Sequence, residues 1–404
     1  MTRPRVVVTG LGVVSSIGLG WRAFWDALLS GRSGIRRIRY LDTTDYPTHY
    51  GGEVDGFEPS AFMPAAVASR VGRGTQFAIA AAQMALSDSR LEPDGGWQAR
   101  TGVCLGTTMA DIQALEEIHR VWVASAGGRL PVSLMSRYPS YAMSTNVAKH
   151  FGLLGPNLMI PTACAAGNYA LAHAFDALRL GKADVMLAGG ADPFSRIAFM
   201  GFNRLLAVAP ERCQPFDRHR KGMMVGEGAA ILVLERLDDA MARGAPIYAE
   251  ILGYGLNCDA HHMTIPHLDG VTTVMRQALA DAGLQPDDID YISAHGTGTP
   301  ANDRTECAAI RAVFGDHTDR MPVSSIKSML GHAMGAASAL EAVACALAVA
   351  TGCLPPTMNF ETPDPECPVD CIPNVSRRHR VRIALNNSFA FGGNNACVVF
   401  AKPA

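Results

Sequence analysis

Residues 160–190 read IPTACAAGNYALAHAFDALRLGKADVMLAGG, and this stretch contains one complete unit of strand, helix and strand. The first strand ends near Pro161, an Ala-rich segment with helical period covers 167–181, and an apolar run at 184–190 ends in two glycines. Continuous apolar runs are typical of strands that are buried on both faces. The stretch therefore predicts an α/β fold in which helices cover layered sheets.

The same alternation continues on both sides of this unit. Further strand-like runs lie at 6–12, 103–108, 229–235, 248–255 and 289–296, helical stretches at 21–31, 74–89, 270–283 and 331–352, and a closing hairpin at 381–401. Residues 164–181 and 332–352 echo each other, since each places a Cys or His just before an Ala-rich helix that ends in Gly. We predict a duplicated α/β unit with halves 1–246 and 247–404. Segments 46–64 and 127–148 show no clear period and are interpreted as insertions that form a cap or a partner surface.

Composition limits the class of protein. The 404 residues carry 35 basic and 37 acidic side chains, a net charge of −2, and 48% are hydrophobic. This balance predicts a well-packed globular chain with no nucleic-acid partner. No secretory signal is visible, and the apolar run 333–350 contains Glu341, which favours a core helix over a membrane span. Ten scattered cysteines without a CxxC pair predict a reduced, cytoplasmic protein with no metal site.

Cys164 occupies the turn between the first strand and the helix of the opening stretch. The N–H groups and the dipole at a helix N-terminus favour a thiolate there. Small neighbours on both sides leave room for a thioester. Most cysteines are structural core residues, so this position alone does not establish a nucleophile.

Two later loops carry histidines of the kind used in acid–base and electrostatic catalysis. His295 follows a strand in SAHGTGTPANDRTE (293–306), and Lys327 and His332 lie in PVSSIKSMLGHAMGA (322–336). A His near a helix N-terminus is biased toward its neutral form, whose N–H can stabilise an enolate. A buried Lys327 needs a carboxylate, for which Glu341 is the first candidate and Glu306 the second.

The stretch NNSFAFGGNN (386–395) predicts a glycine turn between two strands. Backbone N–H groups of such a turn can form half of an oxyanion hole, with the N–H of Cys164 as the other half. Phe389 and Phe391 adjoin the two glycines, so one of these rings is a candidate gate.

Taken together, these motifs resemble the β-ketoacyl-acyl-carrier-protein synthases of the elongating, Cys-His-His type. Residues 215–235 and the loop DAHHMT (259–264) also resemble this family, and the resemblance covers nearly the whole chain. It implies a thiolase-like fold, with duplicated α/β halves in a five-layered α-β-α-β-α arrangement that dimerises. It also implies an acyltransferase that joins a carrier-bound acyl group to malonyl-acyl-carrier protein by decarboxylative Claisen condensation, in fatty acid or type II polyketide or polyene biosynthesis.

The resemblance assigns a role to each candidate residue. Cys164 is implied as the nucleophile, His295 and His332 as enolate-stabilising groups, and Lys327 as a catalytic residue that orients this region. The other implied roles are an oxyanion hole and gate (Cys164, Phe391, Gly392, Gly393), support (Glu341, Glu306, Asp303), pantetheine binding (Thr297, Thr299), the acyl pocket (Met109, Phe202) and carrier binding (Arg70, Arg73, Arg204). No permanent cofactor is implied, because substrates arrive on the 4'-phosphopantetheine of acyl carrier protein.

Three positions depart from the family pattern. Ala390 replaces the usual Gly before the gate, Asn394 replaces a Ser or Thr, and Ile265 replaces a small hydroxyl residue. Because Ala resists a positive φ, we expect a stiffer gate. These departures favour a specialised synthase that makes polyketide or polyene chains.

Several alternatives remain at this stage. One is a non-elongating chain-length partner, or the catalytic half of a heterodimer with a chain-length-factor-like subunit, in place of a homodimer. Others are a thiolase or plant-type synthase acting on coenzyme A, and a Cys-His hydrolase. The presence of Cys164, two His and Lys327 together argues against the inactive partner, the thiolase and the hydrolase.

Overall fold

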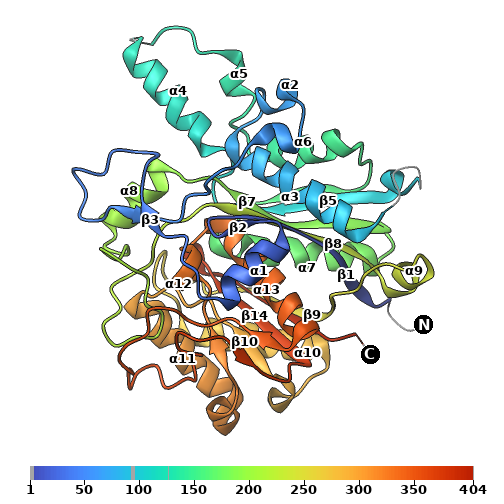
Figure 1. Cartoon of the computed structure of the whole chain (residues 1–404), viewed down its shortest axis with the longest axis vertical. Coiled ribbons are helices and arrows are strands. Elements are labelled where there is room, and N and C mark those ends of the chain that lie inside the picture. Colours follow the sequence, from blue (N-terminus) through green and yellow to red (C-terminus); the bar gives the residue numbers. More distant parts are fainter. Residues whose placement is uncertain (1–3, 92–95, 126, 404) are drawn as a thin grey trace.

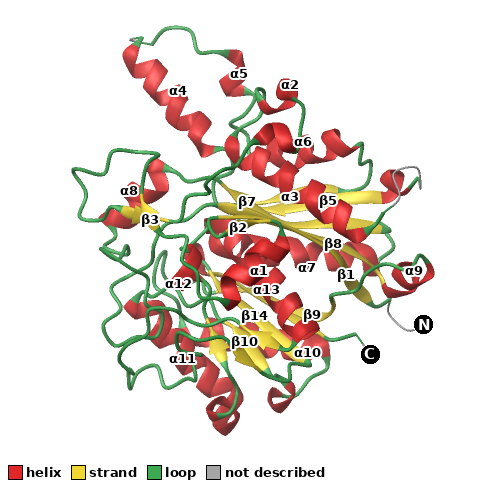
Figure 2. Cartoon of the chain, in the orientation of Figure 1, coloured by secondary structure: helices red, strands yellow, loops and turns green. Residues whose placement is uncertain are grey.

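The computed structural model describes residues 4–91, 96–125 and 127–403, and Figures 1 and 2 show sheets that alternate with layers of helices. The strands of the first half are β1 (Val6–Ser15), β2 (Gly18–Leu19), β3 (Arg36–Arg37), β4 (Tyr50–Gly51), β5 (Thr101–Gly106), β6 (Asn157–Ile160), β7 (Val185–Asp192) and β8 (Gly228–Arg236). Its helices are α1 (Trp21–Leu29), α2 (Ala65–Ala68), α3 (Arg73–Ser89), α4 (Ile112–Ala124), α5 (Val132–Met135), α6 (Tyr141–Phe151), α7 (Ala166–Arg179), α8 (Arg196–Arg204) and α9 (Leu237–Ala242).

The second half also consists of strands and α-helices. Its strands are β9 (Ala249–Cys258), β10 (Tyr291–Ser293), β11 (Val323–Ser324), β12 (Cys353–Leu354), β13 (Arg377–Arg378), β14 (Ile383–Phe389) and β15 (Asn394–Ala401). Its helices are α10 (Leu268–Ala282), α11 (Pro300–Phe314), α12 (Lys327–Leu330) and α13 (Ala337–Thr351).

Strand order shows the duplication directly. The main strands run in the order β11-β10-β14-β15-β9-β1-β8-β7-β5-β6, and β1 pairs with β9 over only residues 6–8 and 249–251. Five strands lie on each side of this short junction, β11-β10-β14-β15-β9 on one side and β6-β5-β7-β8-β1 on the other. When the five strands of each side are renumbered 1 to 5 in the order in which they occur in the chain, both sides have the spatial order 3-2-4-5-1. The strand directions also match between the two sides. In the first half β5 is parallel to β6 and β7, and in the second half β10 is parallel to β11 and β14. The equivalent strands β8 and β15 are each antiparallel to both neighbours.

Helices occupy three layers around these two sheet regions. α3 and α6 cover one outer face, α7 and α13 lie between the sheets, and α10 and α11 cover the other outer face (Figure 2). The predicted five-layered α-β-α-β-α fold is therefore confirmed. The central helices touch through small residues, since a Cβ added to Gly167 would lie 2.7 Å from the backbone nitrogen of Ala339.

The central helix α13 belongs to the core. Within the residues that the structure describes, Met334–Thr351 is the one helical stretch that is long and apolar enough to cross a membrane, and 89% of it is buried inside the fold. Its apolar character is explained by the sheets on both sides of it, as predicted for the run 333–350.

Segment 127–148, which shows no clear period in the sequence, contains helical structure: α5 lies within it and α6 begins at Tyr141. The buried residues of α6 are Ala142, Met143, Ser144, Val147 and Ala148, a mixed set that forms no continuous apolar run in the sequence. Figure 1 shows α4 and α5 projecting from the body, which agrees with an insertion.

Candidate active site

Cys164 lies in a tight turn between β6 and α7. The 3-10 segment Ala163–Ala165, here named the Cys164 turn, begins with a left-handed residue, since Ala163 has φ of 51°. A second turn of the same form, Met334–Ala336, precedes α13 and is named the His332 turn, and Met334 has φ of 52°. A non-glycine residue in this conformation is strained, and such strain is concentrated at functional sites. Both halves therefore present a strained turn at the N-terminus of a central helix.

The Cys164 thiol is almost fully buried, with 5% of the residue exposed. Burial raises its pKa to about 11, although the charge of Lys327 and the backbone N–H of Phe391 oppose this shift. Burial therefore opposes the thiolate that the helix N-terminus is predicted to favour, and loss of hydration has the largest effect on this pKa. The N–H groups of Cys164 and Phe391 both act on the sulfur, which places the two predicted oxyanion donors together.

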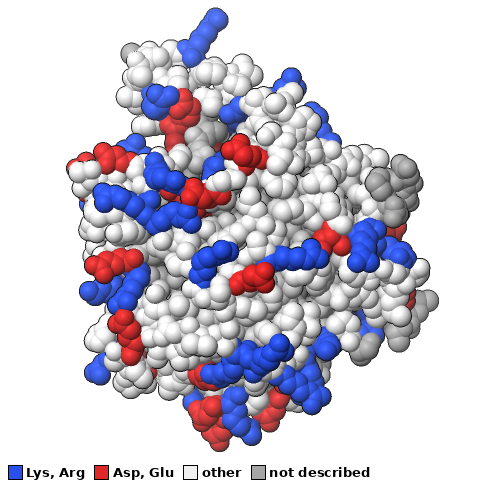
Figure 3. Space-filling model, in the orientation of Figure 1, with Lys and Arg blue, Asp and Glu red and all other residues white. Residues whose placement is uncertain are grey.

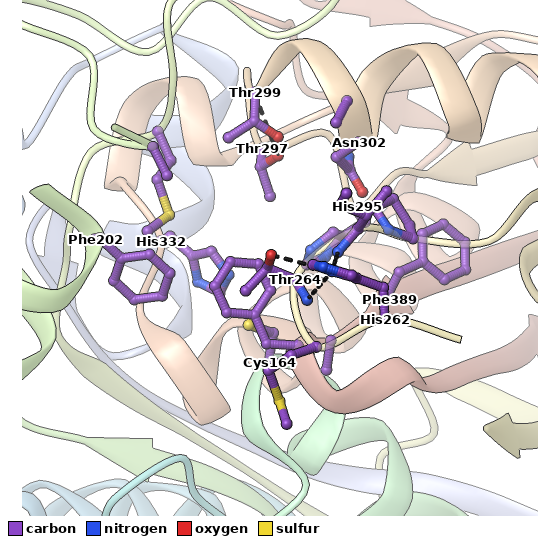
Figure 4. A pocket seen from close by; sticks show the side chains of 18 residues that line it. Cys164, Phe202, His262, Thr264, His295, Thr297, Thr299, Asn302, His332 and Phe389 are labelled. Atoms are coloured by element: carbon purple, nitrogen blue, oxygen red, sulfur yellow. Dashed lines mark hydrogen bonds between the residues drawn. The ribbon is translucent and has the colours of Figure 1, made fainter. Parts of the chain in front are cut away.

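Both predicted histidines face this sulfur across one pocket (Figure 4). The ring centroids of His295 and His332 lie 5.6 Å apart with planes at 84°. Burial lowers the pKa of both imidazoles well below the ordinary value, and the charge of Lys327 lowers them further. The rings are therefore neutral at pH 7.

Hydrogen bonds fix which ring nitrogen carries the proton. The Nδ1 of His332 accepts the N–H of Met334 at 3.1 Å, and the Nδ1 of His295 lies 3.5 Å from the Lys327 ammonium. Because both Nδ1 atoms face donors, both Nε2 atoms carry hydrogens. The pocket thus holds two neutral N–H donors that can bind one carbonyl oxygen.

Lys327 forms a buried ion pair with Glu341, as the sequence predicted. Its Nζ also donates to the carbonyl oxygen of His295 at 2.7 Å. Burial raises the pKa of Glu341 to about 7, while the ammonium opposes that shift. The second candidate partner, Glu306, instead accepts the backbone N–H groups of His295 at 2.9 Å and Gly296 at 2.8 Å.

The loop after His295 carries the predicted pantetheine-binding hydroxyls. Thr297 and Thr299 form a hydrogen bond to each other at 2.8 Å, and both line the pocket. Asp303, on α11, accepts the N–H of Gly298 at 3.2 Å and that of Phe216 at 2.9 Å. Asp303 therefore supports this loop from behind.

The glycine turn closes the pocket on its other side. Gly392 and Gly393 have φ of 82° and 77°, so both require glycine, and Gly392 donates its N–H to the Met263 carbonyl at 2.8 Å. Ala390 has φ of −108°. Its backbone is therefore extended and unstrained in this conformation, and the expectation of a stiffer gate stays a prediction. The Phe391 ring lies 5.4 Å from the ring of Phe202.

The cavity of this pocket is small, at about 60 Å³. Its lining comprises Cys164, Phe202, Ala207, Met223, His262, Met263, Thr264, Ile265, Pro266, His295, Thr297, Thr299, Ala301, Asn302, His332, Phe389, Ala390 and Phe391. This volume holds a few water molecules and no acyl-pantetheine. The structure therefore shows a closed pocket.

Comparison with known proteins gives the family. The family model described as "Beta-ketoacyl synthase, N-terminal domain" matches residues 3–240, and "Beta-ketoacyl synthase, C-terminal domain" matches residues 248–361. The chain belongs to the beta-ketoacyl synthases. It is an enzyme of the elongating, carrier-dependent kind, which forms a carbon–carbon bond by Claisen condensation.

Relatives and solved structures agree over the full length. The chain is 39% identical to the 3-oxoacyl-[acyl-carrier-protein] synthase 2 of Synechocystis sp., covering 100% of this chain and 99% of the relative. The solved ishigamide ketosynthase/chain length factor is 44% identical, with a TM-score of 0.96 and 100% of both chains covered. A ketosynthase complex, AntDE with its type II acyl-carrier protein AntF, is 34% identical with a TM-score of 0.92 and covers 100% of both chains.

The remaining predicted residues of this synthase lie at different places. Phe202 lines the pocket, whereas Met109 packs behind it in the same apolar cluster. Arg204 is exposed at the end of α8, close to Phe202 and Ala207, and Arg70 is exposed after α2. Arg73 is held by the buried Glu227, with an Arg73 Nη2 to Glu227 Oε1 distance of 2.8 Å, so its charge is already neutralised. Figure 3 shows basic and acidic side chains interspersed on the face in view.

Sequence reasoning missed several lining residues of the synthase. Asn302 lies in the first turn of α11, directly after the Thr-rich loop, and Met223 lies in the stretch before β8. Both residues belong to motifs identified in the sequence, 293–306 for Asn302 and 215–235 for Met223. Their membership in these motifs was the evidence from which a role in the site could have been predicted. Their direction toward the cavity depends on how the two halves meet, which no local pattern records.

Proposed function

We propose that this synthase uses Cys164, His295, His332 and Lys327 to carry out decarboxylative condensation with malonyl-acyl-carrier protein. The observation that supports it is the joint enclosure of one thiol, two neutral imidazole N–H donors and two backbone N–H groups. Cys164 comes from the proposed first half, 1–246, and the other three side chains from the second, 247–404. The site therefore needs both halves.

In the first step, the Cys164 sulfur attacks the carbonyl of a carrier-bound acyl thioester. The new acyl–sulfur bond forms as the bond to the carrier sulfur breaks, and the thiol proton passes to the departing carrier thiolate. The N–H groups of Cys164 and Phe391 stabilise the tetrahedral oxyanion. Ser388 fixes the turn by donating its hydroxyl to the Cys164 carbonyl at 3.0 Å.

In the second step, the malonyl thioester oxygen binds between the Nε2–H groups of His295 and His332. The bond to the carboxylate carbon breaks, CO₂ leaves and its electron pair forms an enolate held by these two donors. The enolate carbon then attacks the acyl carbonyl on Cys164, the carbon–sulfur bond breaks, and the departing Cys164 thiolate takes up a proton from water to restore the thiol. Neutral imidazoles suit this step because no proton has to be removed by a strong base.

The pantetheine arm must enter past the gate. We propose that Phe391 moves with the glycine turn, because the closed cavity of about 60 Å³ does not hold the arm. Thr297 and Thr299 then exchange their mutual hydrogen bond for bonds to the arm. Substrates arrive as 4'-phosphopantetheine thioesters on acyl carrier protein, and no permanent cofactor is required.

Carrier docking is proposed at exposed Arg204, with Arg70 as a second contact. Acyl carrier proteins of the polar, acidic kind are steered by such charges. Arg73 is no longer proposed, since Glu227 already neutralises it. Ten free cysteines support a cytoplasmic location.

A specialised pathway is proposed for the product. The 44% identity to the ishigamide ketosynthase/chain length factor and the 34% identity to the type II PKS ketosynthase AntDE support polyketide elongation. The first of these likenesses also supports a second candidate arrangement, in which this chain is the catalytic half of a heterodimer with a chain-length-factor-like subunit. The edge strand β6 exposes Leu158, as an edge that pairs with a second subunit would.

The test is incubation of the purified protein with acyl-carrier and malonyl-carrier, followed by mass analysis of carriers and protein. We expect a β-ketoacyl-carrier product and an acyl group on Cys164, and His332→Ala should trap that acyl group. Release of free acid without a β-keto product would overturn the proposal in favour of a hydrolase. Co-purification distinguishes homodimer from heterodimer.

A further inference from the structure

Asp192 is a fully buried carboxylate at the end of β7, outside the pocket lining. Its Oδ1 accepts the Thr107 hydroxyl at 2.6 Å and the N–H of Met109 at 3.2 Å. Its Oδ2 accepts the N–H of Thr108 at 2.7 Å and that of Gly335 at 2.7 Å. One side chain thus joins two segments that lie more than 200 residues apart in the sequence.

Each segment leads to a different part of the site. Residues 107–109, here named the acyl-pocket loop, end at Met109, which packs with Phe202 in one apolar cluster. Gly335 belongs to the His332 turn, in which the N–H of Met334 holds the Nδ1 of His332. A shift of Asp192 would therefore be transmitted both to the wall of the acyl pocket and to the imidazole.

The two segments touch with almost no space between them. A Cβ on Gly335 would lie 2.4 Å from the carbonyl carbon of Thr107, and a Cβ on Gly190 would lie 2.6 Å from the Gly335 carbonyl oxygen. The Thr107 hydroxyl also accepts the N–H of Ala110 at 2.7 Å, and Ala110 is held at a left-handed φ of 51°. A carboxylate without water is unfavourable unless donors surround it, so the four donors are needed to keep Asp192 in place.

We propose that Asp192 is a positioning residue that couples the acyl-pocket loop to His332. The same carboxylate then sets both the length of acyl chain that fits and the geometry of decarboxylation. This inference rests on the proposed function, in which His332 holds the enolate oxygen.

The test compares wild type with Asp192→Asn. The Asn side chain keeps the shape of Asp, but its NH₂ group would face backbone N–H donors instead of accepting from them. We measure acylation of Cys164 by acyl-carrier, CO₂ release from malonyl-carrier, and the chain length of the products. Acylation should stay within about twofold, CO₂ release should fall at least about tenfold in kcat with little change in KM, and the chain-length limit should shift.

Two further variants separate positioning from general damage. Asp111→Asn removes a buried carboxylate of the same region whose partner is Thr75 on α3, and it should leave the ratio of acylation to CO₂ release unchanged. Thr107→Val removes one donor to Asp192 but leaves Gly335 bound, so it should shift chain length with little change in CO₂ release. If Asp192→Asn does not fold, Asp192→Glu is compared with wild type in acylation and CO₂ release, and Thr107→Val tests the shift in chain length.

Equal loss of acylation and CO₂ release in Asp192→Asn, or unchanged CO₂ release and chain length, would overturn the inference. So would an Asp111→Asn variant that shows the same selective loss. A wild-type protein that gives no β-keto product would overturn the proposed function itself, whatever the variants do.

Discussion

The buried pair of Lys327 and Glu341 gives the sharpest test of the site, because both side chains are about 1% exposed. Glu341→Gln leaves the buried ammonium of Lys327 without its carboxylate. Removing one partner of a buried pair costs about 3–5 kcal/mol of unfolding free energy. The exposed pair of Arg304 and Glu366 is the matched control, and Glu366→Gln should cost less than about 1 kcal/mol.

The double variant Lys327→Met/Glu341→Leu separates stability from chemistry. Replacing both charges with apolar side chains of similar volume should restore most of the lost stability. Decarboxylation should remain about 10²-fold slower, because the Nδ1 and the carbonyl of His295 have both lost their ammonium donor. Urea unfolding followed by circular dichroism measures the stability, and CO₂ release from malonyl-carrier measures the chemistry. A loss below about 1 kcal/mol in Glu341→Gln, or wild-type decarboxylation in the double variant, would refute this reasoning.

Three further predictions use other parts of the pocket. Because burial raises the pKa of Cys164 to about 11, the rate of its alkylation by iodoacetamide should rise about tenfold per pH unit from pH 7 to 9. A plateau of this rate within that range would contradict a raised thiol pKa. The folded-state pKa of His332 lies below its unfolded value, so the unfolded chain binds more protons, and the free energy of unfolding falls as the pH drops below about 6.5. Wild type should therefore lose up to about 1.4 kcal/mol of unfolding free energy per pH unit more than His332→Gln does. Urea titration at each pH measures this difference. Gly393→Ala should slow condensation more than Gly392→Ala, because only at Gly393 would the added Cβ meet the side chain of Asp259, at 2.8 Å. Equal condensation rates in the two variants would show that this contact plays no part in the movement of the gate.

Much of the fold could be predicted from local patterns. The Ala-rich runs after 164 and 332 correspond to α7 and α13, because small residues permit the close packing of a central layer. The 3-2-4-5-1 order could not be predicted, since it depends on crossovers that no periodicity encodes. α6 was not predicted because its buried residues, Ala, Met, Ser and Val, form no continuous apolar run in the sequence.

The candidate site was predictable in its residue types but not in its energetics. Cys164, His295 and His332 stand in distinctive loops, and the structure places them around one cavity. The raised pKa of the thiol could not be predicted, because its main cause is burial by residues that are distant in the sequence. Asp192 gave no signal at all, since its donors come from segments that only the tertiary fold brings together.

The matching Cys164 and His332 turns have a consequence for how such an enzyme can arise. An ancestor built from two identical subunits would present the same strained corner twice about its twofold axis, with equivalent chemistry at each. Fusion into one chain frees the two corners to diverge, so one now offers a sulfur and the other only a glycine N–H beside an imidazole. The reaction requires different groups for accepting the acyl chain and for binding the enolate. In such a fused chain, these different groups occupy equivalent positions of a backbone that was originally symmetric.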